Sequence, residues 1–236
     1  MKTSMIISFS GIDGAGKSTQ AELLANSLAV RNQCVFHTEK VHPARTYSNL
    51  LEIDILAEAA TDAEIILCRF YLASERTAKL QAKLKSGDFY TNKERMQIAL
   101  AAVISAQFDA REWQRRFLKR SKSKVKLYIY DRYAFDEVIY RTLDGLDPLL
   151  LFNFYRCFPP PDFAFWIDTP KNMLNQRQLS VSDRKSELFR DSARLDKLIK
   201  AFRDLAPRFG LLRIDGTQER KDMHLAILAA VKPLWK

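Results

Sequence analysis

The sequence contains the stretch Gly11-Ile-Asp-Gly-Ala-Gly-Lys-Ser-Thr19, which matches the pattern G-x-x-x-x-G-K-[ST]. It directly follows an apolar run, Met5–Ser10, and directly precedes a helical run, Gln20–Ala29. In that context the glycines let backbone N–H groups point at phosphate oxygens, and the helix offers its positive N-terminal end. Lys17 is then expected to reach the β- and γ-phosphates of a bound nucleotide, and Ser18 to ligate Mg²⁺.

Glycine is scarce in the rest of the chain, which makes this loop more distinctive. The chain has 7 glycines in 236 residues, where average usage would supply about 16. Gly11, Gly14 and Gly16 all fall in the loop, which also holds an acid, Asp13. A carboxylate among phosphates is unfavourable unless it meets Mg²⁺ or a substrate hydroxyl, so we expect one of these contacts for Asp13. A plain surface aspartate is the alternative.

Composition excludes several classes of protein. The chain is 47% hydrophobic and 28% charged, with a net charge of +10, so it is neither an intrinsically disordered chain nor a disulfide-stabilised miniprotein. Its uncharged, largely apolar run Ile98–Phe108 is shorter than a bilayer span, and no signal peptide is expected. The cysteines are odd in number and widely spaced, which predicts reduced thiols and a cytoplasmic location.

Strands are predicted to alternate with helices along the chain. This order predicts an α/β fold of the three-layer P-loop type, with a five-stranded parallel sheet flanked by helices in a single domain spanning residues 1–236. Asp131, Asp168 and Asp215 follow three of the strands, at the edge where open α/β sheets bind ligands. The five predicted strands are Met5–Ser10, Cys34–Thr38, Val125–Tyr130, Phe163–Ile167 and Leu211–Ile214.

Two capping-box patterns in the middle of the chain predict helix starts. Thr61 is followed by Glu64, and Thr91 by Glu94, at the spacing that allows side chain and backbone to cap each other. The first helix is predicted to run to Gly87 and the second to about residue 119.

A second candidate motif, Asp131-Arg132-Tyr133, closes the third predicted strand. At the C-terminal end of a central strand in a P-loop protein, Asp131 can reach Mg²⁺ or its waters. Arg132 can bind a second phosphate group through two N–H donors. A structural Asp–Arg pair at a strand end is the alternative.

With these motifs in this order, the chain resembles the thymidylate kinase family of P-loop nucleoside monophosphate kinases. The resemblance implies an ATP-dependent phosphoryl transfer, assisted by Mg²⁺, to a deoxynucleoside monophosphate, with dTMP the expected acceptor. It also implies a lid over ATP at residues 178–190 and a homodimer. The chain is longer than the family pattern in its middle part, which predicts a helical insertion on the acceptor side at residues 41–104. The resemblance rests on the phosphate loop, Asp131-Arg-Tyr-Ala-Phe135, Pro161–Asp168 leading to Arg177, Asp183-Arg184 and Leu211–Gly216.

The resemblance assigns residues to the acceptor site. It implies that Arg132 grips the acceptor monophosphate and that Asp13 lies near both Mg²⁺ and the 3′-hydroxyl of the acceptor. Tyr140 matches an aromatic residue that crowds the 2′ position and so favours deoxyribose; a packed core tyrosine is the alternative. Phe108 and Arg111 match the part that meets the base, and Arg76 is a competing candidate for the arginine.

The resemblance also assigns residues to the donor site. Arg177 matches an arginine that stacks on adenine. The transition-state cation is expected from the lid, with Arg184 the leading candidate ahead of Lys185 and Arg190; a solvated surface charge is the alternative for Arg184. The residues expected to bind ATP are Gly11, Ile12, Asp13, Gly14, Ala15, Gly16, Lys17, Ser18, Thr19 and Arg177.

Two features depart from the family pattern and leave alternatives open. Asp136 and Glu137 stand where the family has small or amide residues; they face solvent, or they accept hydrogen bonds from an amino-bearing base. The basic run Arg111–Lys126 is expected to be a solvated helix face. It also allows a basic P-loop ATPase that acts on nucleic acid, while a nucleotide-binding protein without kinase activity is the third possibility.

Overall fold

A computed structural model describes most of the chain. The described residues are 4–32, 35–39, 51–53, 63–69, 79–80, 83–84, 91–118, 125–156, 158–181, 189 and 191–232. Arg184, Lys185, Arg190 and Arg76, and much of the expected insertion at residues 41–104, lie outside these ranges.

The protein is built on one seven-stranded sheet in the order β3-β2-β4-β5-β1-β6-β7. Every neighbouring pair of strands is parallel except β2 and β3, which pair antiparallel. The predicted α/β fold class is confirmed, although the sheet has seven strands instead of the predicted five. The strands are β1 (Ser4–Ser10), β2 (Val35–Glu39), β3 (Leu51–Ile53), β4 (Ala63–Arg69), β5 (Val125–Asp131), β6 (Phe163–Asp168) and β7 (Leu212–Asp215).

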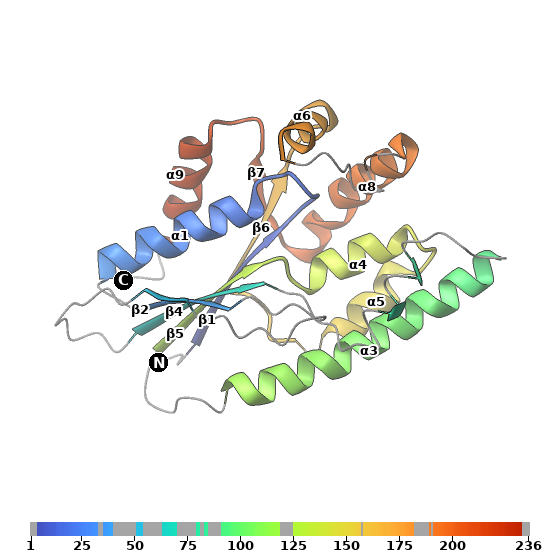
Figure 1. The fold of residues 1–236 in the computed structure, drawn as a ribbon, viewed down its shortest axis with the longest axis horizontal. Helices are drawn as coiled ribbons and strands as arrows, with labels where there is room; N and C mark the ends of the chain where they lie inside the picture. The colour runs from blue at the N-terminus through green and yellow to red at the C-terminus, as the bar shows by residue number, and fades with distance from the viewer. Residues whose placement is uncertain are drawn as a thin grey trace.

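Helices cover both faces of this sheet (Figure 1), with α1 and α9 packed together on one face and α3 and α5 on the other. None of the described helices is long and apolar enough to cross a bilayer. The described helices are α1 (Lys17–Asn32), α3 (Asn92–Leu118), α4 (Ala134–Thr142), α5 (Pro148–Tyr155), α6 (Lys171–Val181), α8 (Ser192–Leu205), the short 3₁₀ turn η1 (Pro207–Phe209) and α9 (Arg220–Val231).

Strand β5 shows how the two faces are filled. Leu127 and Ile129 pack into the cluster that includes α1 and α9, while Tyr128 and Tyr130 pack into the cluster on the α3 and α5 side. Because side chains alternate along a strand, a strand buried on both sides must be apolar at nearly every position. That requirement explains why the strands of the sheet centre could be recognised as continuous apolar runs.

The second capping box behaves as predicted. The backbone N–H of Glu94 donates to Thr91 Oγ1 at 3.1 Å, and α3 then runs to Leu118, close to the predicted end. The helix buries Ala99 and Val103, whereas Met96 is 40% exposed.

The first capping box was a wrong prediction. Strand β4 occupies Ala63–Arg69, where a helix was expected from Thr61 onward, and it pairs in parallel with both β2 and β5. The capping pattern is only four residues long, so it marks a possible helix start but does not determine the structure of the residues that follow. The following apolar run, Ile65–Cys68, suits a strand between two neighbours, and the pairing on both sides decides the outcome.

Candidate nucleotide-phosphate site

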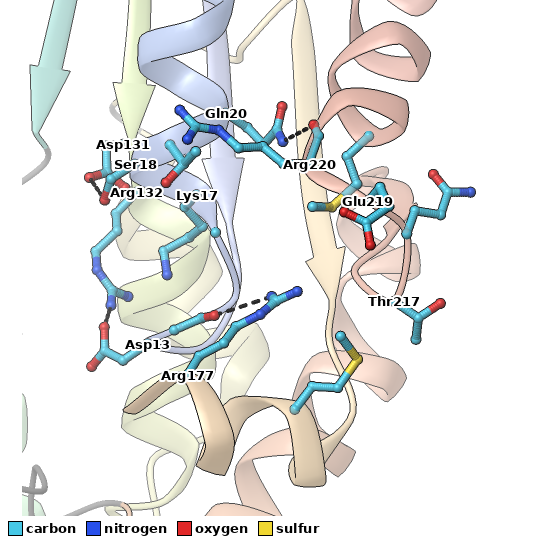
Figure 2. A pocket seen from close by; sticks show the side chains of 16 residues that line it. Asp13, Lys17, Ser18, Gln20, Asp131, Arg132, Arg177, Thr217, Glu219 and Arg220 are labelled. Atoms are coloured by element: carbon cyan, nitrogen blue, oxygen red, sulfur yellow. Dashed lines mark hydrogen bonds and ion pairs between the residues drawn. The ribbon is translucent and has the colours of Figure 1, made fainter. Parts of the chain in front are cut away.

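A cavity of about 740 Å³ opens at the C-terminal edge of the sheet, a size typical of small-molecule sites. Figure 2 shows side chains converging on it from the loop after β1, the end of β5, helix α6 and the loop between β7 and α9. Because all of these segments follow or flank parallel strands, the fold itself brings them to one edge.

The phosphate loop forms one wall of the cavity. Its glycines take backbone angles that other residues rarely adopt, with φ of 82° at Gly14 and 104° at Gly16. Gly14, Gly16, Ser18 and Thr19 line the cavity, while Ile12 and Ala15 are buried behind it. Gly11, with φ of 142°, passes so close to β6 that a Cβ there would lie 3.0 Å from the carbonyl oxygen of Ile167.

Lys17 extends along the loop into the cavity (Figure 2). Its Nζ donates to the carbonyl oxygen of Ile12 at 2.8 Å, and the residue is only 5% exposed. Burial, reinforced by the charge of Arg132, lowers the pKa of Lys17 to about 8 against the opposing pull of nearby aspartates. At neutral pH this leaves a poorly solvated ammonium beside an open cavity, which suits it to bind an anion.

Ser18 and Asp131 are the predicted metal-binding pair, and the structure brings them together. Ser18 Oγ donates to Asp131 Oδ2 at 2.6 Å, and Asp131 is 6% exposed. These hard oxygen donors fit Mg²⁺, which is usually held by one or two protein oxygens together with substrate phosphates and water. Ser18 and Asp131 are therefore the residues that would hold the ion.

Asp13 and Arg132, predicted to act on the acceptor, form an ion pair at the cavity wall (Figure 2). Arg132 has φ of 75°, a strained angle for a residue with a side chain, and its backbone N–H donates to the carbonyl oxygen of Phe9 at 2.9 Å. The guanidinium carbon lies 5.5 Å from the centre of the Tyr140 ring. Tyr140 thus lies beside the predicted acceptor arginine, and its side chain also packs edge-on against Phe202.

Arg177 ties the phosphate loop to the opposite wall of the cavity. Its Nη1 donates to the carbonyl oxygen of Ala15 at 3.2 Å, and its Nη2 to that of Gly216 at 3.1 Å. Thr169 Oγ1 donates to the same Ala15 oxygen at 3.3 Å. A Cβ at Gly216 would collide with the Thr169 side chain, so only glycine allows this close approach.

Several cavity residues carry no sequence motif and were missed. Gln20 could have been suspected from its place in the first turn of α1, where its Nε2 donates to the Arg220 carbonyl oxygen at 2.9 Å. The others lie on α6, on the loop after β7 or on α9, and their residue types do not by themselves indicate a binding role. The missed lining residues are Gln20, Met173, Thr217, Gln218, Glu219, Arg220 and Met223.

Of the two acids that depart from the family pattern, Asp136 does not face solvent, whereas the Glu137 side chain is 29% exposed. Asp136 is 3% exposed and accepts hydrogen bonds from the backbone N–H groups of Gly11 and Tyr133, while Glu137 accepts one from Arg141 on its own helix. Side-chain packing at α4 could not be deduced from the sequence.

Two other strand-end aspartates also have structural partners. Asp168 pairs with Arg213 at 2.8 Å, and Asp215 accepts from the Thr217 backbone at 2.9 Å. Of the three aspartates predicted at this edge, Asp131 lines the cavity.

Some predicted site residues cannot be placed. Arg184 lies outside the described residues. The backbone positions of Phe108 and Arg111 belong to α3, but their side chains are outside the described part of the structure. Their roles stay predictions.

Comparisons with known proteins agree with this arrangement. The chain matches a thymidylate kinase of Leptospira interrogans at 26% identity, over 94% of this chain and 91% of that protein. A probable thymidylate kinase of Thermococcus onnurineus matches at 26% identity over 97% of both chains. Over nearly its whole length, the chain is therefore similar to proteins named thymidylate kinase.

A solved thymidylate kinase structure has the same fold as this chain. The crystal structure from Ehrlichia chaffeensis superimposes with a TM-score of 0.61 at 19% identity, covering 98% of this chain and 100% of that one. No family model matches the chain. The similarity to thymidylate kinases is carried by relatives that match over nearly the full length of both chains.

Proposed function

We propose that the protein transfers the γ-phosphoryl group of ATP to the 5′-phosphate of a deoxynucleoside monophosphate, with dTMP the expected acceptor. One observation carries the proposal: the phosphate loop and Arg132 line a single cavity, where the Asp13–Arg132 ion pair joins them. Such a cavity has a cradle for donor phosphates on one side and a guanidinium for a second phosphate on the other. The relatives named thymidylate kinase support the same reaction.

In this proposal catalysis consists of positioning and charge neutralisation. Lys17 binds the β- and γ-phosphates, and the loop's backbone N–H groups hold the remaining phosphate oxygens. Arg132 orients the acceptor phosphate, and Arg177 contacts the adenine side of the donor. When bound, Mg²⁺ supplies further neutralisation of phosphate charge, held by Ser18 and Asp131.

The acceptor's sugar and base are the finer part of the proposal. Tyr140 is half-buried against Arg132, so it stands close to where an acceptor sugar would follow its phosphate. We propose that it disfavours a 2′-hydroxyl. The proposal also includes Arg184 as the lid cation and base contacts by Phe108 and Arg111. It further includes a homodimer and a cytoplasmic location.

A coupled assay across a panel of monophosphates tests the function. We expect more ADP to form with dTMP than with dUMP, dGMP, dCMP or the ribonucleotides. Arg132→Ala should lower kcat/KM for dTMP about 100-fold. Full activity in Lys17→Ala, or no conversion of any monophosphate by the wild-type protein, would contradict the proposal.

A further inference from the structure

One charged side chain near the site has no part in the chemistry proposed above. Asp136 lies in the first turn of α4, and its side chain is 4% exposed. Burying a carboxylate is costly unless hydrogen bonds and an opposite charge compensate for the lost water. The partners of Asp136 therefore indicate why it is there.

Two backbone groups from separate elements fix this carboxylate. The N–H of Gly11, at the start of the phosphate loop, donates to Oδ1 at 3.1 Å. The N–H of Tyr133, which precedes α4, donates to Oδ2 at 3.2 Å. With both oxygens held, the carboxylate has a defined position relative to both the phosphate loop and the end of β5.

The third partner is the arginine assigned to the acceptor. Arg132 Nη1 lies 3.4 Å from Asp136 Oδ1, while its other terminal nitrogen, Nη2, pairs with Asp13. The two carboxylates differ in their surroundings: the Asp13 side chain is 46% exposed and lines the cavity, whereas that of Asp136 is buried. A ligand phosphate entering the cavity can displace Asp13 from Arg132, but it cannot reach Asp136.

We propose that Asp136 is a positioning residue that holds the Arg132 guanidinium in the orientation that receives the acceptor phosphate. The inference rests on the proposed kinase function. Asp136 anchors one side of the guanidinium to the phosphate loop, and the Nη2 side, now paired with Asp13, turns to the substrate. The distance between donor and acceptor phosphates is thereby linked to the position of Gly11.

The charge of Asp136 and its hold on the Arg132 side chain have opposite effects on acceptor binding. A carboxylate behind Arg132 reduces the net positive charge offered to a phosphate, so removing it would strengthen acceptor binding if charge alone mattered. A bidentate arginine contact depends on orientation, however, and a misplaced guanidinium loses most of that binding. The two effects predict opposite changes in the acceptor KM, which makes the proposal testable.

The experiment compares Asp136→Asn with the wild-type protein in steady-state kinetics with dTMP and ATP. The asparagine oxygen can still accept from Gly11, but the negative charge opposite Arg132 is lost, and the Tyr133 N–H loses its acceptor because an amide nitrogen only donates. We expect the KM for dTMP to rise about 10-fold while kcat and the KM for ATP change less than about 3-fold. An unchanged or lower KM for dTMP overturns the proposal.

Matched variants separate positioning from a general structural effect. Glu137→Gln removes the neighbouring acid, which pairs with Arg141 on its own helix, and should leave the KM for dTMP unchanged. Arg132→Lys raises that KM by itself, and adding Asp136→Asn to it should cause no further rise. Equal additive effects in the double variant overturn the proposal, because they show that Asp136 does not act through Arg132.

A second measurement covers the case in which Asp136→Asn fails to fold. In the wild-type protein, the Arg132 guanidinium should give resolved, slowly rotating Nη signals in nitrogen NMR, assigned by their loss in Arg132→Lys. These signals should persist in Asp13→Asn, because Asp136 still holds the group, and their collapse there overturns the proposal. Since this readout needs no turnover, it stands even if the wild-type protein converts no monophosphate, an outcome that would overturn the proposed function alone.

Discussion

At the scale of single residues, the phosphate loop behaves as its sequence predicts. Lys17, Ser18 and the glycines could be assigned because each is demanded by backbone geometry or by phosphate charge, which are local requirements. The contact of Lys17 with the Ile12 carbonyl shows the ammonium folded back on its own loop. A bound phosphate would replace this carbonyl as the partner.

The lowered pKa of Lys17 gives a pH prediction. Because the pKa is near 8, the charged form that binds phosphate is present below that pH and is lost as the pH rises through it. We expect kcat/KM for ATP to fall above about pH 8, since this quantity reports groups of the free enzyme. In Lys17→Arg the guanidinium stays charged, so its lower activity should not decline over the same range. A decline of equal size in that variant would assign the effect to another group.

The burial of Asp136 could not be predicted from the sequence. An aspartate in the first turn of a helix is expected at the surface, where it favours the helix dipole. Here it is buried instead, because β1 and β5 bring Gly11 and Arg132 against the start of α4. Which side chains meet between segments over a hundred residues apart depends on the tertiary packing, and no local pattern encodes it.

At the scale of elements, the five predicted strands are all present, with bounds shifted by one residue at several of their ends. They were identifiable because burial on both faces makes each nearly continuously apolar. Strands β3 and β4 were not predicted. The apolar run of β4 is short and also fits a helix. Pairing of β4 with both β2 and β5 favours a strand over a helix in this segment, and that pairing depends on the whole sheet.

Helices α3, α4 and α8 are joined through one buried carboxylate. The Asp144 side chain is 1% exposed and pairs with Arg95 of α3 at 2.7 Å and with Arg141 of α4 at 2.9 Å. Arg194 of α8 lies 3.7 Å away. The group therefore fixes α4, which carries Asp136 and Tyr140, against its neighbours.

Removing this carboxylate should destabilise the protein. We expect Asp144→Ala to lower the free energy of unfolding by about 3 kcal/mol, because it removes the buried carboxylate that Arg95 and Arg141 share. Chemical denaturation monitored by circular dichroism measures the change. Asp204→Ala, which breaks an exposed pair with Lys200, is the control and should cost under about 1 kcal/mol. Equal losses in both variants would contradict the role given to Asp144.

At the scale of the whole molecule, the parallel sheet explains why residues from distant parts of the chain share one cavity. The loop after β1, the end of β5, helix α6 after β6 and the loop after β7 meet at the C-terminal edge of the sheet (Figure 1). Sequence reasoning could predict this edge as the site, since the direction of strands in a parallel sheet is fixed. It could not predict the wall formed by Gln218 and Glu219, because their chemistry is generic.

The central claim is that phosphate passes from one nucleotide to another within this cavity. The most direct measurement uses ATP labelled at the γ-phosphate together with dTMP and Mg²⁺, with the products separated by chromatography. If the protein is a monophosphate kinase, the label appears in dTDP, and Lys17→Ala abolishes its transfer. Label that appears only as inorganic phosphate, or that remains on ATP, would contradict the proposed function.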